Sequence, residues 1–455
     1  MFGARIYGIS LSYTDDICIG LKGRGTDLVC EWREFSMGGY LASVDVYYNG
    51  STVRVELPEK NLLAVLEPND RTSSSSPQEL VKYALAHPEG SGSFGSFLEG
   101  KESVLVIVND GTRPTPTRYV LDTLADHIDS LDVSFIVATG VHRGPTEEEY
   151  RFIFGEQYER FRDHIHVHDA RDDAQMVYLG RSKNGTPLYV NRLAVEADAI
   201  IVIGSVEPHY FAGYTGGRKG ILPGIASYET IEQNHKLALS EHAKSLALEG
   251  NPVHEDMIDA LQMIHTPIFS LMTVLDKHHG IYQVTAGGIH EAFYAAIEAA
   301  KEVFVAQVPQ KADIVVTVAK YPMDVDLYQA QKAIDNAKLV LKPGGVMILV
   351  AACREGLGEK AFIDLLSCSP TPQQVLEKIR ETYKLGYHKA GKMAEVFLHS
   401  EVIALTELPD HELEQIFIHP TDSLQGALDR ALAKAGEDAK VVFLPDGCVT
   451  VPSLS

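Results

Sequence analysis

The chain has 455 residues, of which 45% are hydrophobic and 22% are charged, a composition typical of a globular protein large enough for two domains. Its 62 acidic and 40 basic residues give a net charge of −22, which repels nucleic-acid phosphates and anionic membrane surfaces. We therefore expect neither a nucleic acid nor a membrane as a partner.

The cysteines and the N-terminal segment favour the cytoplasm. The five cysteines form no CxxC pair and lie far apart, which argues against a disulfide scaffold and a zinc knuckle. The N-terminal residues carry charges early and lack the apolar core of a signal peptide. No run of 18 apolar residues is present, so we expect no membrane-spanning helix.

In chain order, residues 1–70 resemble short strands separated by turns, and the polar segment 69–76 is predicted to be a loop. Continuous apolar runs then alternate with helical patterns. The runs cover residues 103–110, 133–140 and 197–209, and a helical pattern follows each of them. This alternation predicts a mainly parallel sheet that is covered by helices on both faces.

The second half repeats this pattern, with apolar runs at 312–319 and 343–353. We place the domain junction near Pro309 and expect an α/β fold of two domains, each with a mainly parallel sheet flanked by helices. The predicted domains are residues 1–308 and 309–439, with an active-site cleft between them. The final strand, within 440–455, is expected to fold back onto either domain.

Unusual residues gather in the loops that follow the apolar runs, where open parallel sheets bind their ligands. Asp110 and Thr112 are candidate helix caps, and Arg113 offers a fork of donors to an anion. In the next loop, Thr146 and Glu149 have the spacing of a capping box.

His142 lies in that second loop and is not explained by the cap. Its imidazole is suited to proton transfer near neutral pH, although a lone histidine is more often structural. Arg113, in the first loop, has an alternative interpretation as an ordinary surface arginine that binds no anion.

The strongest candidate is the loop at 207–224, which contains His209. Five glycines in twelve of its residues accompany the adjacent cations Arg218 and Lys219. Glycines let the backbone approach a ligand closely, but the pattern matches neither GxxxxGK[ST] nor GxGxxG. A functional loop is favoured over a mobile surface loop, because the latter seldom combines histidine, arginine and lysine so tightly.

Later histidines are weaker candidates. His235, in the helix after this loop, is either a metal ligand or an ordinary helical residue, and the sequence alone favours the latter. His164, His166 and His168 alternate along a predicted strand and are interpreted as a solvated face.

In the second domain, Gln329 and Lys332 share one face of a helix. They are positioned either to reach across a cleft or to form a solvated helical turn. The segment Tyr387–Lys389 is a weaker aromatic and cationic cluster.

Taken in order, these motifs resemble those of the nickel-pincer lactate racemase family. The segments that carry the resemblance are DGTRPTP (110–116), TGVHR (139–143), EPHYFAGYTGGRKGILPG (207–224), His235 and LYQAQK (327–332). The resemblance implies an isomerase that racemises a small, lactate-like 2-hydroxy acid by hydride abstraction and return. It also implies partner enzymes that mature the cofactor.

The cofactor implied by the resemblance is a pyridinium-3,5-bisthiocarboxylic acid mononucleotide-type pincer attached to Lys219. It would hold nickel together with His235, and soft sulfur ligands suit that metal. The other residues that the resemblance assigns to the cofactor site are Asp110, Thr112, Gly216, Gly217 and Arg218.

The resemblance assigns His142 and His209 as paired acid and base, with Arg113 and Lys332 holding the substrate and Gln329 assisting. Returning hydride to the other face of a planar keto acid inverts the centre, so each enantiomer needs its own base. Because Trp32 is the only tryptophan, an aromatic wall from the second domain would use Tyr328 or Tyr387.

Two other functions stay open. A metal-dependent hydrolase could use His142, His209 and His235, but the chain has no HExxH motif and Lys219 would go unexplained. A non-catalytic carboxylate- or phosphate-binding protein of the same fold would keep the basic loops without any turnover.

Overall fold

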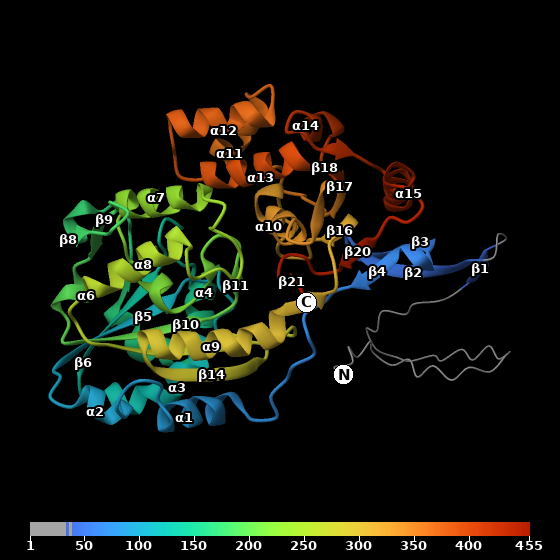
Figure 1. Cartoon of the computed structure of the whole chain (residues 1–455). Helices are drawn as coiled ribbons and strands as arrows, with labels where there is room; N and C mark the ends of the chain where they lie inside the picture. The colour runs from blue at the N-terminus through green and yellow to red at the C-terminus, as the bar shows by residue number, and fades with distance from the viewer. Residues whose placement is uncertain (1–32, 36–38) are drawn as a thin grey trace.

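The computed structural model describes residues 33–35 and 39–455, and the expectations for residues 1–32 and 36–38, including Cys18, Cys30 and Trp32, lie outside the described residues. The chain forms two α/β domains that lie side by side (Figure 1). Within the described ranges, none of the helices has the length and apolar character needed to cross a membrane.

The first domain is built on a six-stranded sheet, in which all neighbours are parallel except the antiparallel edge pair β13 and β14. In spatial order the strands are β14 (Ile281–Gly288), β13 (Ile268–Leu275), β10 (Ala199–Ser205), β5 (Ser103–Asn109), β6 (Asp132–Ala138) and β7 (Ile165–Val167). Strand β10 is buried along its whole length, which explains its continuous apolar run. The predicted α/β fold is confirmed.

Helices cover both faces of this sheet and leave two apolar cores, one on each side. One face carries α1 (Pro77–Ala86), α2 (Phe94–Leu98), α3 (Thr117–Ile128), α4 (Glu147–Phe154) and α5 (Tyr158–Phe161). The other carries α6 (Leu193–Glu196), α7 (Tyr228–Lys236), α8 (Pro252–Gln262) and α9 (Ile289–Phe304). The capping box predicted for Thr146 and Glu149 is present at the start of α4.

Two short hairpins extend the first domain. Strands β8 (Met176–Arg181) and β9 (Pro187–Asn191) pair antiparallel, as do β11 (Pro208–His209) and β12 (Gly213–Tyr214). The second hairpin lies within the glycine-rich loop and gives its first half a defined backbone.

The second domain has its own six-stranded sheet, which is parallel throughout. Its strands, in spatial order, are β19 (His419–Pro420), β18 (Glu401–Leu405), β17 (Leu341–Val350), β16 (Ala312–Val318), β20 (Val441–Leu444) and β4 (Leu62–Val65). Its helices are α10 (Leu327–Ala337), α11 (Lys360–Ser367), α12 (Pro372–Glu381), α13 (Tyr387–His399), α14 (Asp410–Glu414) and α15 (Leu424–Ala435).

The prediction of one continuous first domain over residues 1–308 is wrong for the described N-terminal strands. Strand β4 pairs with β20 of the second sheet. The antiparallel sheet of β1 (Arg33–Phe35), β2 (Gly39–Tyr48) and β3 (Ser51–Pro58) buries Val44 and Leu57 against Val316 of β16. Figure 1 shows these blue strands beside the orange and red second domain.

The chain end lies at the predicted junction. Strand β21 (Val451–Leu454) pairs in parallel with β15 (Val305–Val308), whereas β20 stays within the second sheet. Pro309 lies between the end of β15 at Val308 and the start of β16 at Ala312. The last strand, β21, contacts the end of the first domain only through its short pairing with β15.

We predict that cutting the chain in the exposed loop between Ser74 and Ser75, through an inserted protease site, leaves the N-terminal fragment bound. The pairing of β4 with β20 and the shared apolar core hold it in place. Size-exclusion chromatography followed by mass spectrometry checks this, with the same sample in urea as the dissociated control. Release of the N-terminal fragment under native conditions would contradict the domain assignment.

Candidate active site

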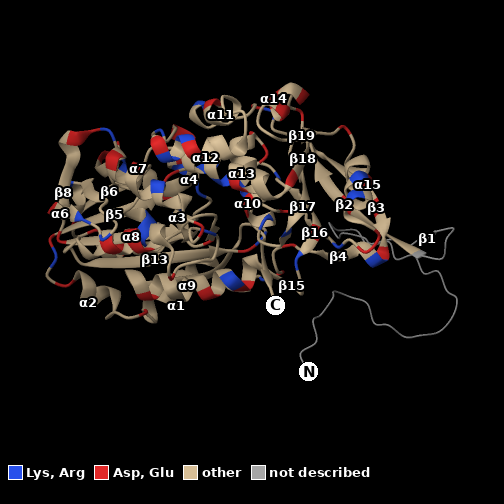
Figure 2. Ribbon diagram, turned by 45° about the horizontal axis from the view of Figure 1, so that its top comes forward, with Lys and Arg blue, Asp and Glu red and all other residues tan. Residues whose placement is uncertain are grey.

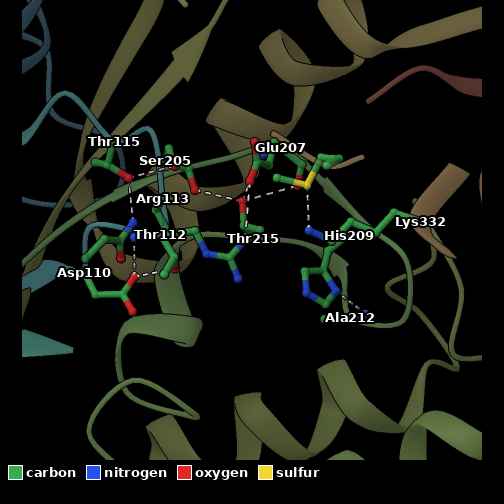
Figure 3. A network of polar contacts seen from close by, with 12 residues as sticks. Asp110, Thr112, Arg113, Thr115, Ser205, Glu207, His209, Ala212, Thr215 and Lys332 are labelled. Carbon is green, nitrogen blue, oxygen red and sulfur yellow. Dashed lines mark hydrogen bonds and ion pairs between the residues drawn. The ribbon is translucent and has the colours of Figure 1, made fainter. Parts of the chain in front are cut away.

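The predicted residues of the first domain meet where β5, β6 and β10 end, and α10 of the second domain approaches the same region. Figure 3 shows Arg113, His209 and Lys332 directed toward a common space, with Glu207 beside Arg113. Arg113 and Glu207 form an ion pair, with Nη1 of Arg113 3.7 Å from Oε1 of Glu207. Acidic and basic residues are otherwise interspersed over both domains (Figure 2), so this gathering of cations is local.

Asp110 orients His142. The Nδ1 atom of His142 lies 2.7 Å from one carboxylate oxygen of Asp110, and the Thr112 hydroxyl donates to the other at 2.6 Å. Burial tends to raise the pKa of Asp110, but the hydrogen bond and charge of His142 outweigh it and the pKa is lowered. An ionised Asp110 accepts a hydrogen bond from Nδ1–H, and the neutral ring of the half-exposed His142 then has its lone pair on Nε2.

His209 has the opposite arrangement. Its Nδ1 accepts a hydrogen bond of 3.3 Å from the backbone N–H of Ala212, so its neutral form carries the proton on Nε2. Its ring packs against Tyr210 and, edge-on, against Phe211. Burial, reinforced by the charge of Lys219, holds the pKa of His209 well below its ordinary value, so the imidazole is neutral.

Lys219 is an amine without a counterion. It lies in the short helical turn Gly217–Gly220, with Nζ 5.5 Å from the centre of the Phe211 ring. Over the described residues it has no hydrogen bond from Nζ and no ion pair. Burial, and then the charge of Arg113, lower the pKa of Lys219 well below its ordinary value, which favours the neutral and nucleophilic form.

Arg218 supports the loop, and the cofactor contact that the resemblance implies for it stays a prediction. It is 1% exposed, and its guanidinium donates to the carbonyls of Ala212 at 2.7 Å and Tyr214 at 3.1 Å. It also donates to Gly216 O at 3.4 Å and stacks over Phe293. Arg218 therefore holds the backbone that presents Lys219.

Gly216 and Gly217 are also required by packing. Gly216 has φ +79°, and a Cβ there would lie 2.5 Å from the Val206 side chain. Gly217 has φ +51°, and its N–H donates to the sulfur of Met272 at 3.1 Å. Both glycines hold the turn close to β10. The N–H of Gly217 is already hydrogen-bonded within the protein, to Met272.

His235 has the features of a metal ligand. Its Nδ1 is buried and has no hydrogen-bond partner of ordinary geometry among the described residues, and its ring lies edge-on to Phe211. Burial, with Lys219 adding to the effect, lowers the pKa of His235 to about 3, while the Ile231 carbonyl opposes the shift. A neutral imidazole with a free nitrogen is the form that binds a metal.

The described part of the chain holds no group of three His, Cys, Asp or Glu residues arranged for a metal ion. A zinc hydrolase built on His142, His209 and His235 needs three such protein ligands.

The second domain contributes Lys332 and Gln329 from α10, and both are half-buried. Lys332 Nζ lies 3.1 Å from the sulfur of Met323, and burial followed by the charge of Arg113 lowers its pKa. The Gln329 side chain makes no hydrogen bond to a described residue, whereas its backbone N–H donates to the helix-capping side chain of Asp326. The candidate site thus spans both domains.

Sequence reasoning undervalued several residues. Phe211 lies at the centre, because its ring contacts His209, His235 and His388. Of the two aromatic candidates for a second-domain wall, Tyr328 contacts Lys389, whereas Tyr387 packs on Tyr383. The Tyr387–Lys389 cluster was a visible signal, but only folding brings it to the site.

The prediction that His164, His166 and His168 form a solvated face is wrong for one of the three. His164 and His166 are exposed as predicted, but His168 is 2% exposed. Its Nε2 lies 2.9 Å from the Ala226 carbonyl, and its own carbonyl accepts from Thr139. Strand β7 ends at Val167, so alternation no longer determines the direction of His168.

Two α/β domains that enclose imidazoles and uncompensated cations define an enzyme with its active site between the domains. Family models agree with this class. Residues 48–247 match the lactate racemase N-terminal domain, and residues 307–451 match the lactate racemase C-terminal domain.

Individual relatives cover almost the whole chain. The lactate racemase of Thermoanaerobacterium thermosaccharolyticum is 34% identical over 421 residues, which is 90% of this chain and 98% of the relative. That of Lactiplantibacillus plantarum is 32% identical over 422 residues, or 90% and 99%. The chain therefore belongs to the lactate racemase family and is an isomerase.

Solved structures share the fold. The lactate racemase apoprotein from T. thermosaccharolyticum matches with a TM-score of 0.84 and 33% identity, covering 90% of this chain and all (100%) of that one. A Thermotoga maritima protein matches with a TM-score of 0.63 and 20% identity, covering 86% and 100%, which supports the fold alone.

We predict that Arg218→Met lowers the free energy of unfolding by about 3 kcal/mol, because it leaves buried carbonyls without their donor. Urea denaturation measures the change. The control is Arg162→Met at an exposed arginine, expected to change stability by less than about 0.5 kcal/mol. Equal effects of the two substitutions would show that Arg218 does not support the loop.

Proposed function

We propose that this chain racemises lactate or a closely related small 2-hydroxy acid, with a nickel-bearing pyridinium pincer group tethered to Lys219. The observation that carries the proposal is the complementary state of two imidazoles. The neutral His142 has its lone pair on Nε2 because Nδ1–H donates a hydrogen bond to Asp110, and His209 has a proton on Nε2 because the Ala212 N–H donates to Nδ1. One base and one acid are what the inversion of a single centre requires.

The chain offers suitable groups for this cofactor. Lys219 supplies an amine for the covalent link, with a pKa that burial lowers, and His235 supplies an unpartnered nitrogen for nickel. Asp110 and Thr112 are linked through a hydrogen bond and lie at the same strand end. When bound, the pincer group supplies an acceptor for the hydride at C2 of the substrate.

The protein residues bind the substrate and move its proton. Arg113 and Lys332 approach from different domains and would grip the carboxylate, which fixes the plane of the reacting centre. His142 Nε2 would accept the hydroxyl proton of one enantiomer as C2 gives up its hydride. His209 would give a proton to the same oxygen when the hydride returns to the opposite face of C2, so the product has the same atoms as the substrate and the opposite configuration. Gln329 would assist from the turn of α10 before Lys332.

The proposal requires partner enzymes that build and load the cofactor, and we assign the reaction to the cytoplasm. The described cysteines Cys353, Cys368 and Cys448 are free thiols, which is typical of a reducing compartment. The carboxylate-binding protein without catalysis is less well supported, because it gives no role to the complementary histidines.

We predict that His142→Ala and His209→Ala each lower racemase turnover of the matured protein by about 10²-fold or more, since a positioned acid or base contributes that much. Chiral chromatography of D- and L-lactate measures turnover, and intact mass checks that Lys219 stays modified. The control is His166→Ala at an exposed histidine, which should keep its activity. Near-normal turnover in both directions by either site variant would contradict the two-histidine scheme.

A further inference from the structure

Helix α13 brings three basic residues into the interface between the domains. His388, Lys389 and Lys392 are 4%, 6% and 3% exposed. Lysine is almost never buried this fully unless it has a partner. Lys392 has one in the first domain, because its Nζ donates to the Ala243 carbonyl at 2.7 Å.

Lys389 is less well satisfied. Its Nζ donates one hydrogen bond of 2.7 Å to the Tyr328 carbonyl and lies 3.3 Å from the centre of the Tyr328 ring. It also lies 5.8 Å from the ring of Tyr210, which follows the proposed acid His209. No described carboxylate is within ion-pair distance of Lys389, so an ammonium with three donors uses one of them.

The neighbours of Lys389 belong to the substrate side of the site. After burial, the charge of Lys332 is the largest influence that lowers the pKa of Lys389, and Asp326 and Asp335 oppose it without pairing. Lys332 in turn is close enough to Arg113 for its pKa to be lowered by that charge. A substrate with one carboxylate matches Arg113 and Lys332, and leaves Lys389 uncompensated.

Hydrogen bonds hold α13 against the catalytic loop. Nε2 of His388 lies 3.3 Å from the Tyr210 hydroxyl, and Nδ1 lies 3.0 Å from the Tyr383 hydroxyl. The His388 ring also lies edge-on to His235, with centroids 5.6 Å apart. Lys389 is therefore fixed beside the reacting residues by its neighbour along the helix.

From this arrangement we infer that Lys389 binds a second carboxylate of the substrate, which makes a short 2-hydroxy dicarboxylic acid the preferred substrate class. A buried ammonium is costly unless an anion pairs with it, and a carboxylate provides a charge-assisted hydrogen bond. The inference rests on the proposed function and refines the identity of the substrate for the same site.

The test compares kcat/KM of the matured protein for L-malate, L-2-hydroxyglutarate and L-lactate, by chiral chromatography. We expect at least one of the two dicarboxylates to exceed lactate by about tenfold or more. Lys389→Met should lower this ratio by about 10- to 100-fold, the value of a hydrogen bond between charged groups. Lys389→Arg, which keeps the charge, should retain a preference for the dicarboxylate.

The matched control is Lys392→Met, which removes a buried cation from the same helix but not from the site. It should change malate and lactate turnover in proportion and leave their ratio unaltered. An unaltered ratio in Lys389→Met, or a wild-type protein that prefers lactate, would overturn the inference while leaving the racemase proposal intact.

Loss of racemisation for all three acids would instead contradict the proposed function. In that case, thermal unfolding of the wild-type protein with malate or lactate decides the inference. Greater stabilisation by malate would support it, and equal or smaller stabilisation would overturn it.

Discussion

The candidate site depends on three lysine amines that lie between the two domains without a carboxylate partner among the described residues. Lys219, Lys332 and Lys389 come from three separate segments, and none has a carboxylate within ion-pair distance in the described chain. Burial lowers the pKa of each. Such a site is unfavourable until anions enter it, so the folded chain is arranged to bind anionic molecules.

In this fold, some charged residues hold the backbone or a neighbouring side chain in place, and other residues face the site. Arg218 donates its hydrogen bonds to backbone carbonyls within the glycine-rich loop. The next residue, Lys219, lies beside the Phe211 ring. Asp110 similarly supports the site, because its carboxylate is hydrogen-bonded to Nδ1 of His142. The second domain then covers the strand ends with α10 and α13, and the β15–β21 pair ties the two domains together.

Local signals allowed part of this structure to be predicted. The presence of a helix after the first apolar run, the cap at Thr146 and the loop around Lys219 follow from patterns within about a dozen residues. The membership of β4 in the second sheet depends on pairing between distant segments. Strand β14 instead forms an antiparallel hairpin with β13, which precedes it directly in the chain. Adjacent basic residues likewise look equivalent in a sequence, and only packing against Phe293 separates Arg218 from Lys219.

The central claim is that Lys219 is the attachment point for the group that compensates these charges. Intact-mass and peptide mass spectrometry of protein co-produced with the cofactor-building enzymes tests it most directly. The account predicts added mass on the peptide that contains Lys219, and its absence in Lys219→Ala. Protein that racemises a 2-hydroxy acid with Lys219 unmodified would contradict the account.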